Sequence, residues 1–412
     1  MKTTTPAVVI APGILGTTIA RSLGRLGVPM IGVFSNARSP SRRSRYWTKT
    51  YVWDVQASSA ELSFAFLSSL ARDAPDKPVL LSTDDDTCLF IARHARILRE
   101  WYRFPDQPEG LPEHLSSKRG MYQLCEQHGI PTAATVFPDS LADVEAYITS
   151  GAFPVMLKAI DTQALQRRAG LRMMVVEDGD SLRHWYTELE TPESPNLMIQ
   201  ELIPGDSSAV WMFNGYFDAD SRCLFGMTGQ KLRQYPAYTG ATSLGVCMPN
   251  SRVSDLTMRF MADLEYRGIL DIGYKYDIRT GEYKLLDVNP RIGATFRLFV
   301  DSAGMDVARA MYCDLTGQAV VTGQHIAGRK WMSEAFDVAS SWRYYRDGKI
   351  SFRRWLTSFR GVKEGMWFAS DDPAPLISLL GYGIRHFSRR RFSGTAQGGF
   401  TESHEQSLAA TQ

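Results

Sequence analysis

The segment KLLDVNPRIG, residues 284–293, carries the sharpest chemical signal in the sequence. It predicts a strand that a proline ends, and Asp287 and Asn289 stand two residues apart, so both side chains leave the same face. A carboxylate and an amide oxygen side by side suit a hard cation such as Mg²⁺, and the Arg291 guanidinium beyond them suits phosphate oxygens. The alternative is a hairpin with an ordinary polar outer face.

Two lysines stand where local physics disfavours a cation. Lys118 falls in the first turn of a helix predicted over 117–128, at the positive end of the helix dipole. Lys158 lies in FPVMLKAI, an apolar segment that predicts a buried strand, where an unpaired ammonium is costly. A polyphosphate facing both lysines would explain both positions. The alternatives are a frayed-turn lysine and a strand-edge lysine.

The segment LMIQELIPGD predicts a strand that carries Gln200 and Glu201 into a Pro-Gly turn ending at Asp206. Extended backbone here could pair with an adenine edge, and the carboxylate could bind ribose hydroxyls. A plain strand and turn is the alternative.

The segment QKLRQYP places two more cations on a strand. Lys231 and Arg233 alternate with Leu232, so we expect both to leave the same face. Arg297 adds a guanidinium just after residues 284–293. Solvated charges on an exposed strand are the alternative.

In this order, these segments resemble the ATP-grasp enzymes, and among them the carboxylate–amine ligases of the D-aspartate-ligase kind. The matching segments are SSKRGMYQLCEQHGIPTAAT, FPVMLKA, MIQELIPGD, QKLRQYP and YKYDIRTGEYKLLDVNPRIG. The resemblance implies an α/β protein with a Rossmann-like N-terminal domain, a two-lobed ATP-grasp fold and a C-terminal extension. The expected parts are that first domain (1–105), a small lobe (106–190), a large lobe with the magnesium site (191–327), a basic aromatic extension (328–392) and a disordered tail (393–412).

The resemblance also implies a role for each matching residue. Lys118 and Lys158 would bind the ATP phosphates, and Asp206 would contact the ribose. The adenine hinge would comprise Gln200, Glu201, Leu202 and Ile203. The ligands of Mg²⁺, or of Mn²⁺ in its place, would be Asp287, Asn289 and an acid from the opposite strand, with Asp277 preferred to Asp271. The cations around the transferring phosphoryl group would be Arg291, Lys231, Arg233 and Arg297.

The implied reaction phosphorylates a small carboxylate with ATP and joins the resulting acyl phosphate to an amine of an amino acid. Such phosphoryl transfer needs charge neutralisation and no enzyme nucleophile, so none of the five cysteines needs a catalytic role. ATP-dependent carboxylation and phosphorylation of a small acid are alternatives on the same fold. A catalytically silent nucleotide-binding regulator is an alternative of another class.

The first hundred residues alternate predicted strands (7–11, 29–34, 79–81) with predicted helices (14–26, 83–101), which indicates a parallel sheet. Gly13 and Gly16 form G-x-x-G and not the complete dinucleotide-binding fingerprint. Four arginines in the loop 36–49 nevertheless keep an NADP-dependent oxidoreductase as a rival. Three acids at 84–86 begin the second helix, where they would either cap it or hold the ammonium of an amino-acid substrate.

The 412 residues are 44% hydrophobic, which indicates folded domains. Their net charge of +2 is too small to indicate a protein that binds a polyanion over its whole surface. The cysteines are scattered without a C-x-x-C pair, and no long uncharged apolar run occurs, so we expect a cytoplasmic protein. We expect a monomer or homodimer and no nucleic acid partner. Residues 342–391 hold 11 Lys and Arg against 4 Asp and Glu. A weak peripheral membrane contact through 376–392 is one interpretation, and a packed helix with a basic end is the other.

Overall fold

The computed structural model describes residues 1–381 apart from 11–12, 172 and 192. The chain forms two compact units, and each is assembled from separate stretches of sequence. Unit 1 contains residues 1–112, 211–271 and 289 onward, and unit 2 contains 113–210 and 272–288. The chain passes between the units four times, within the helix α5 (Leu111–Ser116) and within the strands β9 (Val210–Phe217), β12 (Gly268–Asp277) and β13 (Glu282–Asn289). The five-part division expected from the sequence stays a prediction, and its tail, 393–412, lies outside the described residues.

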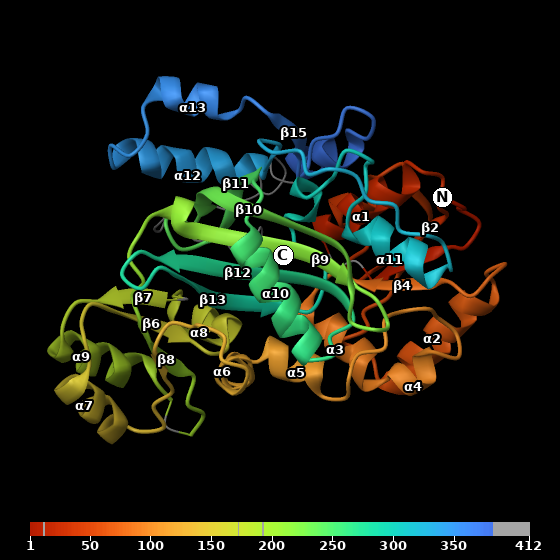
Figure 1. Cartoon of the computed structure of the whole chain (residues 1–412). Helices are drawn as coiled ribbons and strands as arrows, with labels where there is room; N and C mark the ends of the chain where they lie inside the picture. The colour runs from red at the N-terminus through yellow and green to blue at the C-terminus, as the bar shows by residue number, and fades with distance from the viewer. Residues whose placement is uncertain (11–12, 172, 192, 382–412) are drawn as a thin grey trace, which may run out of the picture. The chain divides into compact units, whose positions relative to one another are not determined.

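A parallel sheet with the strand order β3-β2-β1-β4 begins unit 1 (Figure 1). Its strands are β1 (Ala7–Ile10), β2 (Met30–Phe34), β3 (Trp47–Val52) and β4 (Val79–Ser82). The helices of this part are α1 (Ile14–Gly24), α2 (Ala60–Arg72), α3 (Asp85–Arg93) and α4 (Ala95–Leu98), with the 3-10 turn η1 (Pro40–Arg43). Alternate residues of β1 enter two cores, because Ala7 and Val9 pack with α1 while Val8 and Ile10 pack with α2, α3 and α4. The predicted parallel sheet with covering helices is confirmed.

Two details of this part differ from the sequence prediction. The stretch expected to be helical over 83–101 is helical but divided, because the chain leaves helical geometry at His94 and forms the separate helices α3 and α4. The strand β3 was not expected. Its side chains are half-buried or exposed, so it lacks the apolar run that marks a buried strand.

The large sheet has the order β13-β12-β9-β10-β11-β14-β15. Its remaining strands are β9 (Val210–Phe217), β10 (Cys223–Tyr235), β11 (Ala241–Cys247), β14 (Lys330–Met332) and β15 (Val362–Gly365). The helical segments that accompany it are α10 (Ser251–Asp263), η3 (Phe296–Leu298), α11 (Val307–Leu315), α12 (Glu334–Arg346) and α13 (Phe352–Ser358). One hydrophobic core joins β1 and α1 to β9, β10 and α11, which explains why these distant stretches form one unit.

Unit 2 is built around a small antiparallel sheet of order β5-β8-β6-β7. Its strands are β5 (Thr135–Val136), β6 (Val155–Ala159), β7 (Met173–Val176) and β8 (Leu197–Glu201). Its helical segments are α6 (Lys118–Gln127), α7 (Leu141–Ser150), α8 (Thr162–Ala169), α9 (Gly179–Leu189) and η2 (Ser207–Ala209), while α5 (Leu111–Ser116) spans the unit boundary. Helix α6 confirms the helix predicted over 117–128.

None of the helices within the described ranges is both long enough and apolar enough to cross a membrane.

Candidate functional site

Lys118 is the first residue of α6, and the Ser117 side chain caps that helix by accepting a hydrogen bond from the Gly120 N–H at 3.3 Å. The Lys118 ammonium donates to the carboxylate of Asp287 on β13. The carboxylate offsets the unfavourable position of a cation at a helix N-terminus. Within unit 2, the fold therefore brings together the lysine predicted for phosphate and the acid predicted for a metal.

Strand alternation places Lys158 and Gln200 on one face of the small sheet. Leu157 of β6 and Ile199 of β8 enter the core with α7 and α9, so their neighbours Lys158 and Gln200 point to the other face. Lys158 Nζ lies 3.0 Å from Gln200 Oε1. The Gln200 amide also donates to the Tyr122 hydroxyl and, at 3.0 Å, to Thr135. Gln200, predicted as part of the hinge, thus uses its side chain to hold Lys158.

The charges around Lys158 change its acidity. Burial and, to a smaller extent, the ammonium groups of Lys118 and Lys275 lower the pKa of Lys158 to about 8, and Asp287 opposes them. Burial also lowers the pKa of Lys275, against the effect of Asp206. Three ammonium groups thus interact in one part of unit 2, and such a concentration of like charge favours binding of a polyanion.

The surroundings of Asp277 differ from those expected of a metal ligand. Its fully buried carboxylate accepts hydrogen bonds from Arg279 Nε and Lys284 Nζ, each at 2.9 Å, and the Arg279 bond holds its pKa well below the usual range. Lys284 also bonds Glu201 at 2.9 Å, and Arg279 bonds the same carboxylate. Because two cations already satisfy Asp277, this placement argues against a metal there. The roles of Arg279 and Lys284 were not expected from the sequence, although both residues lie close to the turn between β12 and β13.

The predicted hinge region leaves β8 at Glu201, whose N–H donates to the Ala134 carbonyl at 2.8 Å. Ile203 is buried, and Leu202 is partly buried. Asp206 is exposed and caps η2, since its carboxylate accepts from the Ser208 N–H at 2.9 Å and the Ser208 hydroxyl at 2.6 Å. The local structure of 201–206 therefore contains the strand and turn of the alternative interpretation, and the adenine and ribose contacts stay a prediction.

In unit 1, Arg291 forms a two-pronged ion pair with Asp85, with Nε–Oδ1 and Nη2–Oδ2 distances of 2.6 and 3.1 Å. Arg291 also lies 3.4 Å from Asn289 Oδ1. Asp84 caps α3 by accepting from the Thr87 N–H at 2.8 Å. The acidic run at 84–86 is thus divided between a helix cap, as one interpretation expected, and an anchor for Arg291, which neither expected.

Asp271, the alternative metal acid, lies beside the segment that follows β13. A Cβ added at Gly293 would stand 2.1 Å from Asp271 Oδ2, so only glycine fits there. Asn214 Nδ2 lies 3.4 Å from the other carboxylate oxygen. Within the part of the chain that the structure describes, no group of three or more His, Cys, Asp or Glu could hold a metal. Each of Asp271, Asp287 and Asn289 carries an oxygen donor of the kind that Mg²⁺ prefers, and their role as metal ligands stays a prediction.

The chain resembles known proteins in sequence and in structure. No protein-family model matches it. It is 27% identical over 251 residues to D-aspartate ligase of Enterococcus faecium (strain Aus0004). This match covers 58% of this chain and 58% of that ligase. N5-carboxyaminoimidazole synthetase from Staphylococcus aureus complexed with ADP matches 80% of this chain and 81% of its own at a TM-score of 0.61 and 11% identity. The structure of L-amino acid ligase from Bacillus licheniformis matches 80% of this chain and 79% of its own chain, at a TM-score of 0.58 and 13% identity. The chain therefore has the fold of ATP-grasp structures.

Two of the cations predicted around the phosphoryl group have other partners in the structure. β-Bulges shift the register of β10 on both sides of Arg233, so Lys231 and Arg233 do not follow the simple alternation that the sequence suggested. Lys231 is partly buried, and its ammonium bonds the Gly240 carbonyl at 3.3 Å. Arg233 is buried and forms two bonds to Asp337, at 2.8 and 2.7 Å. Its charge is neutralised inside unit 1, which indicates a structural role.

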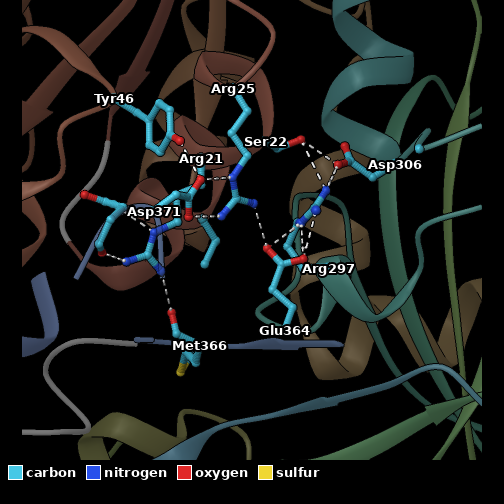
Figure 2. A network of polar contacts seen from close by, with 12 residues as sticks. Arg21, Ser22, Arg25, Tyr46, Arg297, Asp306, Glu364, Met366 and Asp371 are labelled. Atoms are coloured by element: carbon cyan, nitrogen blue, oxygen red, sulfur yellow. Dashed lines mark hydrogen bonds and ion pairs between the residues drawn. The ribbon is translucent and has the colours of Figure 1, made fainter. Parts of the chain in front are cut away.

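Figure 2 shows the corresponding arrangement around Arg297, which is also buried. Its guanidinium bonds Glu364 of β15 at 2.8 Å and also bonds Asp306. Arg25 reaches the same Glu364 at 3.2 Å and binds Asp371 at 2.8 Å. The catalytic role expected for Arg297 is therefore not supported, because two carboxylates already take up its charge.

The same network ties the segment 364–372 to α1. Arg21 on α1 bonds Asp372 at 2.9 Å, and both side chains are almost fully buried. The Tyr46 hydroxyl lies 2.5 Å from Asp371 (Figure 2). Breaking a buried pair leaves an uncompensated charge, so these contacts hold the extension within unit 1.

The anchoring of Arg291 gives a first prediction. Replacing Asp85 with Asn removes the charged, two-pronged acceptor, so we expect kcat for ATP turnover to fall about tenfold while the KM for ATP changes little. Asp85 is 51% exposed, so we expect the free energy of unfolding to change by less than about 1 kcal/mol. Steady-state kinetics and thermal unfolding measure both effects.

Asp86→Asn, in the same helical turn, is the matched control and should leave kcat unchanged. Asp85→Glu should recover part of the lost activity, because it restores the carboxylate. A natural kcat in Asp85→Asn would show that Arg291 needs no such positioning residue.

Proposed function

We propose that this protein is an ATP- and Mg²⁺-dependent ligase that joins a small carboxylate to the amine of an amino acid. The observation that carries the proposal lies in unit 2, where Lys118 pairs with Asp287 and the charge of Lys158 interacts with those of Lys118, Lys275 and Asp287. The similarity to a D-aspartate ligase supports the type of reaction. Because this chain spans only 58% of that ligase, the activity is a proposal for this chain.

The proposed chemistry has two steps. A carboxylate oxygen of the acid attacks the γ-phosphorus of ATP, the bond to ADP breaks, and an acyl phosphate forms. The amine nitrogen then attacks the acyl carbon, inorganic phosphate leaves, and the amine loses a proton. Both steps need charge neutralisation and positioning, which the proposed site supplies without a covalent enzyme intermediate.

The chain's own residues divide this work. Lys118 and Lys158 bind phosphate oxygens, and Lys118 exchanges its carboxylate partner for them. Arg291, oriented by Asp85, faces the charge of the transferring group. Asp287 and Asn289 are the proposed ligands of Mg²⁺, which when bound would neutralise phosphate charge, and Asp271 is the acid that we now prefer to Asp277. The proposal also includes an adenine hinge at 200–203, a ribose contact through Asp206 and an accessory role for Lys231.

A screen for ADP release tests this function. The full chain is incubated with Mg-ATP and pairs of amino acids and small carboxylates, and the products are analysed by mass. We expect a product whose mass equals acid plus amine minus water. Release that depends on bicarbonate would indicate a carboxylase, and a phosphorylated acid as the final product would indicate a kinase. A lack of turnover with every pair, together with tight ATP binding, would indicate a regulator.

Several expectations about the whole protein belong to the same proposal. They are a cytoplasmic location, a monomeric or homodimeric state and a weak membrane contact through 376–392, of which residues 382–392 lie outside the described residues. The NADP-dependent oxidoreductase is not retained, because the fold is shared with ATP-grasp structures, one of which holds ADP.

A further inference from the structure

Helix α12 is apolar on both of its sides. Its inner side packs on β10 and β11, where Phe336 and Tyr344 are buried (Figure 1). Its outer side exposes Val338, Trp342 and Tyr345, which are 64%, 67% and 55% exposed. These three residues follow the i, i+4, i+7 spacing of a single helical stripe. The solvent side of a surface helix normally carries polar residues, so an apolar stripe on that side indicates a binding surface.

The exposed apolar character continues into α13. Phe352 and Leu356 are 61% and 50% exposed and stand one helical turn apart. On α12, the rings of Trp342 and Tyr345 lie nearly parallel, with their centroids 6.3 Å apart. We name these residues the outer surface: Val338, Trp342, Tyr345, Phe352 and Leu356.

Basic residues surround the outer surface. Residues 334–363 contain seven Lys and Arg and three Asp and Glu. Two of the three acids face inward, since Asp337 is buried against Arg233 and Glu334 accepts hydrogen bonds from backbone N–H groups of 367 and 368. The exposed basic side chains are Arg343, Arg346, Lys349, Arg353, Arg354, Arg360 and Lys363. The solvent side of α12 and α13 is therefore both apolar and cationic.

We propose that the outer surface binds an anionic lipid membrane from one side, as a peripheral contact. Trp and Tyr suit the interface, where a ring meets both headgroups and acyl chains, and Phe and Leu enter the acyl boundary. Arginine and lysine bind the headgroup phosphates. This contact is independent of the proposed ligase activity, and it does not use residues 382–392.

A second copy of the chain is a poorer occupant. In a two-fold interface the same surface meets itself, so the arginines on α12 and α13 would face one another. Like charges across an interface oppose association, whereas phosphate headgroups complement them. The charge of the surface therefore selects lipid.

Sedimentation with vesicles tests the proposal. The full chain should sediment with vesicles of phosphatidylcholine and phosphatidylserine at low salt, release at high salt, and bind phosphatidylcholine vesicles only weakly. Each basic residue near such a surface contributes a factor of about five in affinity, so Arg353→Glu with Arg354→Glu should weaken binding by about 25-fold or more. Trp342→Ser should weaken it about tenfold through lost apolar contact.

Matched controls are Leu62→Ser, at an apolar side chain on α2 that is 57% exposed, and Arg38→Glu, at an exposed arginine. Both should bind vesicles as the natural chain does, and all of these variants should keep the natural ATP turnover. The proposal fails if the full chain does not bind anionic vesicles at low salt. It also fails if Trp342→Ser changes only the oligomeric state, or if reversing charges at 389–391 abolishes binding while the α12 and α13 variants bind normally.

Discussion

Replacing Asp287 with Asn is expected to lower Mg²⁺-dependent ATP turnover about a thousandfold or more. The amide has no negative charge, so it loses both the proposed ligand for the cation and the partner of Lys118. The Asp287 side chain is 47% exposed, so an amide of the same shape fits, and we expect the loss of the ion pair to cost at most about 1 kcal/mol of folding stability. ADP release at increasing Mg²⁺ concentrations, with a thermal unfolding curve, measures both effects.

The matched control is Asp180→Asn in the same unit, where the carboxylate is 97% exposed and pairs with Arg183 on α9. It removes an acid–base pair without touching the proposed site, so turnover should stay at the natural level. A partial recovery of Asp287→Asn at high Mg²⁺ would support a ligand role. Undiminished turnover in Asp287→Asn at low Mg²⁺ would remove the metal assignment.

Replacing Lys158 with Met is expected to weaken ATP binding about 10- to 100-fold, because a charge-assisted bond to phosphate is lost. Met fills a similar volume and needs no hydration, so the folded state should tolerate it. Gln200 loses one donor and keeps Tyr122 and Thr135 as partners. Calorimetric titration with a non-hydrolysable ATP analogue measures the change in affinity.

The acidity of Lys158 adds a pH signature. Burial lowers its pKa to about 8, so Lys158 is charged below that pH and neutral above it in the free protein. Bound phosphate stabilises the charged form and raises the pKa, so nucleotide binding takes up a proton above about pH 8. The ATP affinity of the natural chain should therefore fall as the pH rises through 8, and Lys158→Met should lack this fall.

Folding stability should respond in the same window. Between about pH 8 and the ordinary lysine pKa of 10.5, the unfolded chain binds more protons at Lys158 than the folded chain does. The free energy of unfolding of the natural chain should thus rise with pH there, relative to Lys158→Met. Lys49→Met, at an exposed lysine on β3, is the control for both pH effects. An identical pH profile in Lys158→Met and the natural chain would contradict the assignment.

The elements that carry the candidate site could be predicted because their signals are local. Each signal lies within a few residues of the structure that it specifies: Ser117 before α6, the apolar run of β6, and the turn between β12 and β13. Hydrophobic periodicity and capping act over one or two turns of chain, so a single sequence contains them. The positions of Lys118, Lys158 and Asp287 on their elements followed from these signals.

The partners of the charged side chains were decided by the tertiary structure. Arg291 and Asp85 are 206 residues apart in the chain, and Arg297 and Glu364 are 67 apart. A sequence shows that a cation and an acid exist, and only the packing of distant segments shows whether they neutralise each other or remain for a ligand. The bulges that redirect Arg233 and the cations that satisfy Asp277 arise in the same way. The sequence by itself therefore determined the fold class and the local chemistry of each motif. Only the tertiary structure distinguished the lysines of unit 2, which are proposed to bind a ligand, from the arginines that stabilise unit 1. The physical reason is that the interaction between two charges depends on their distance in space and not along the chain.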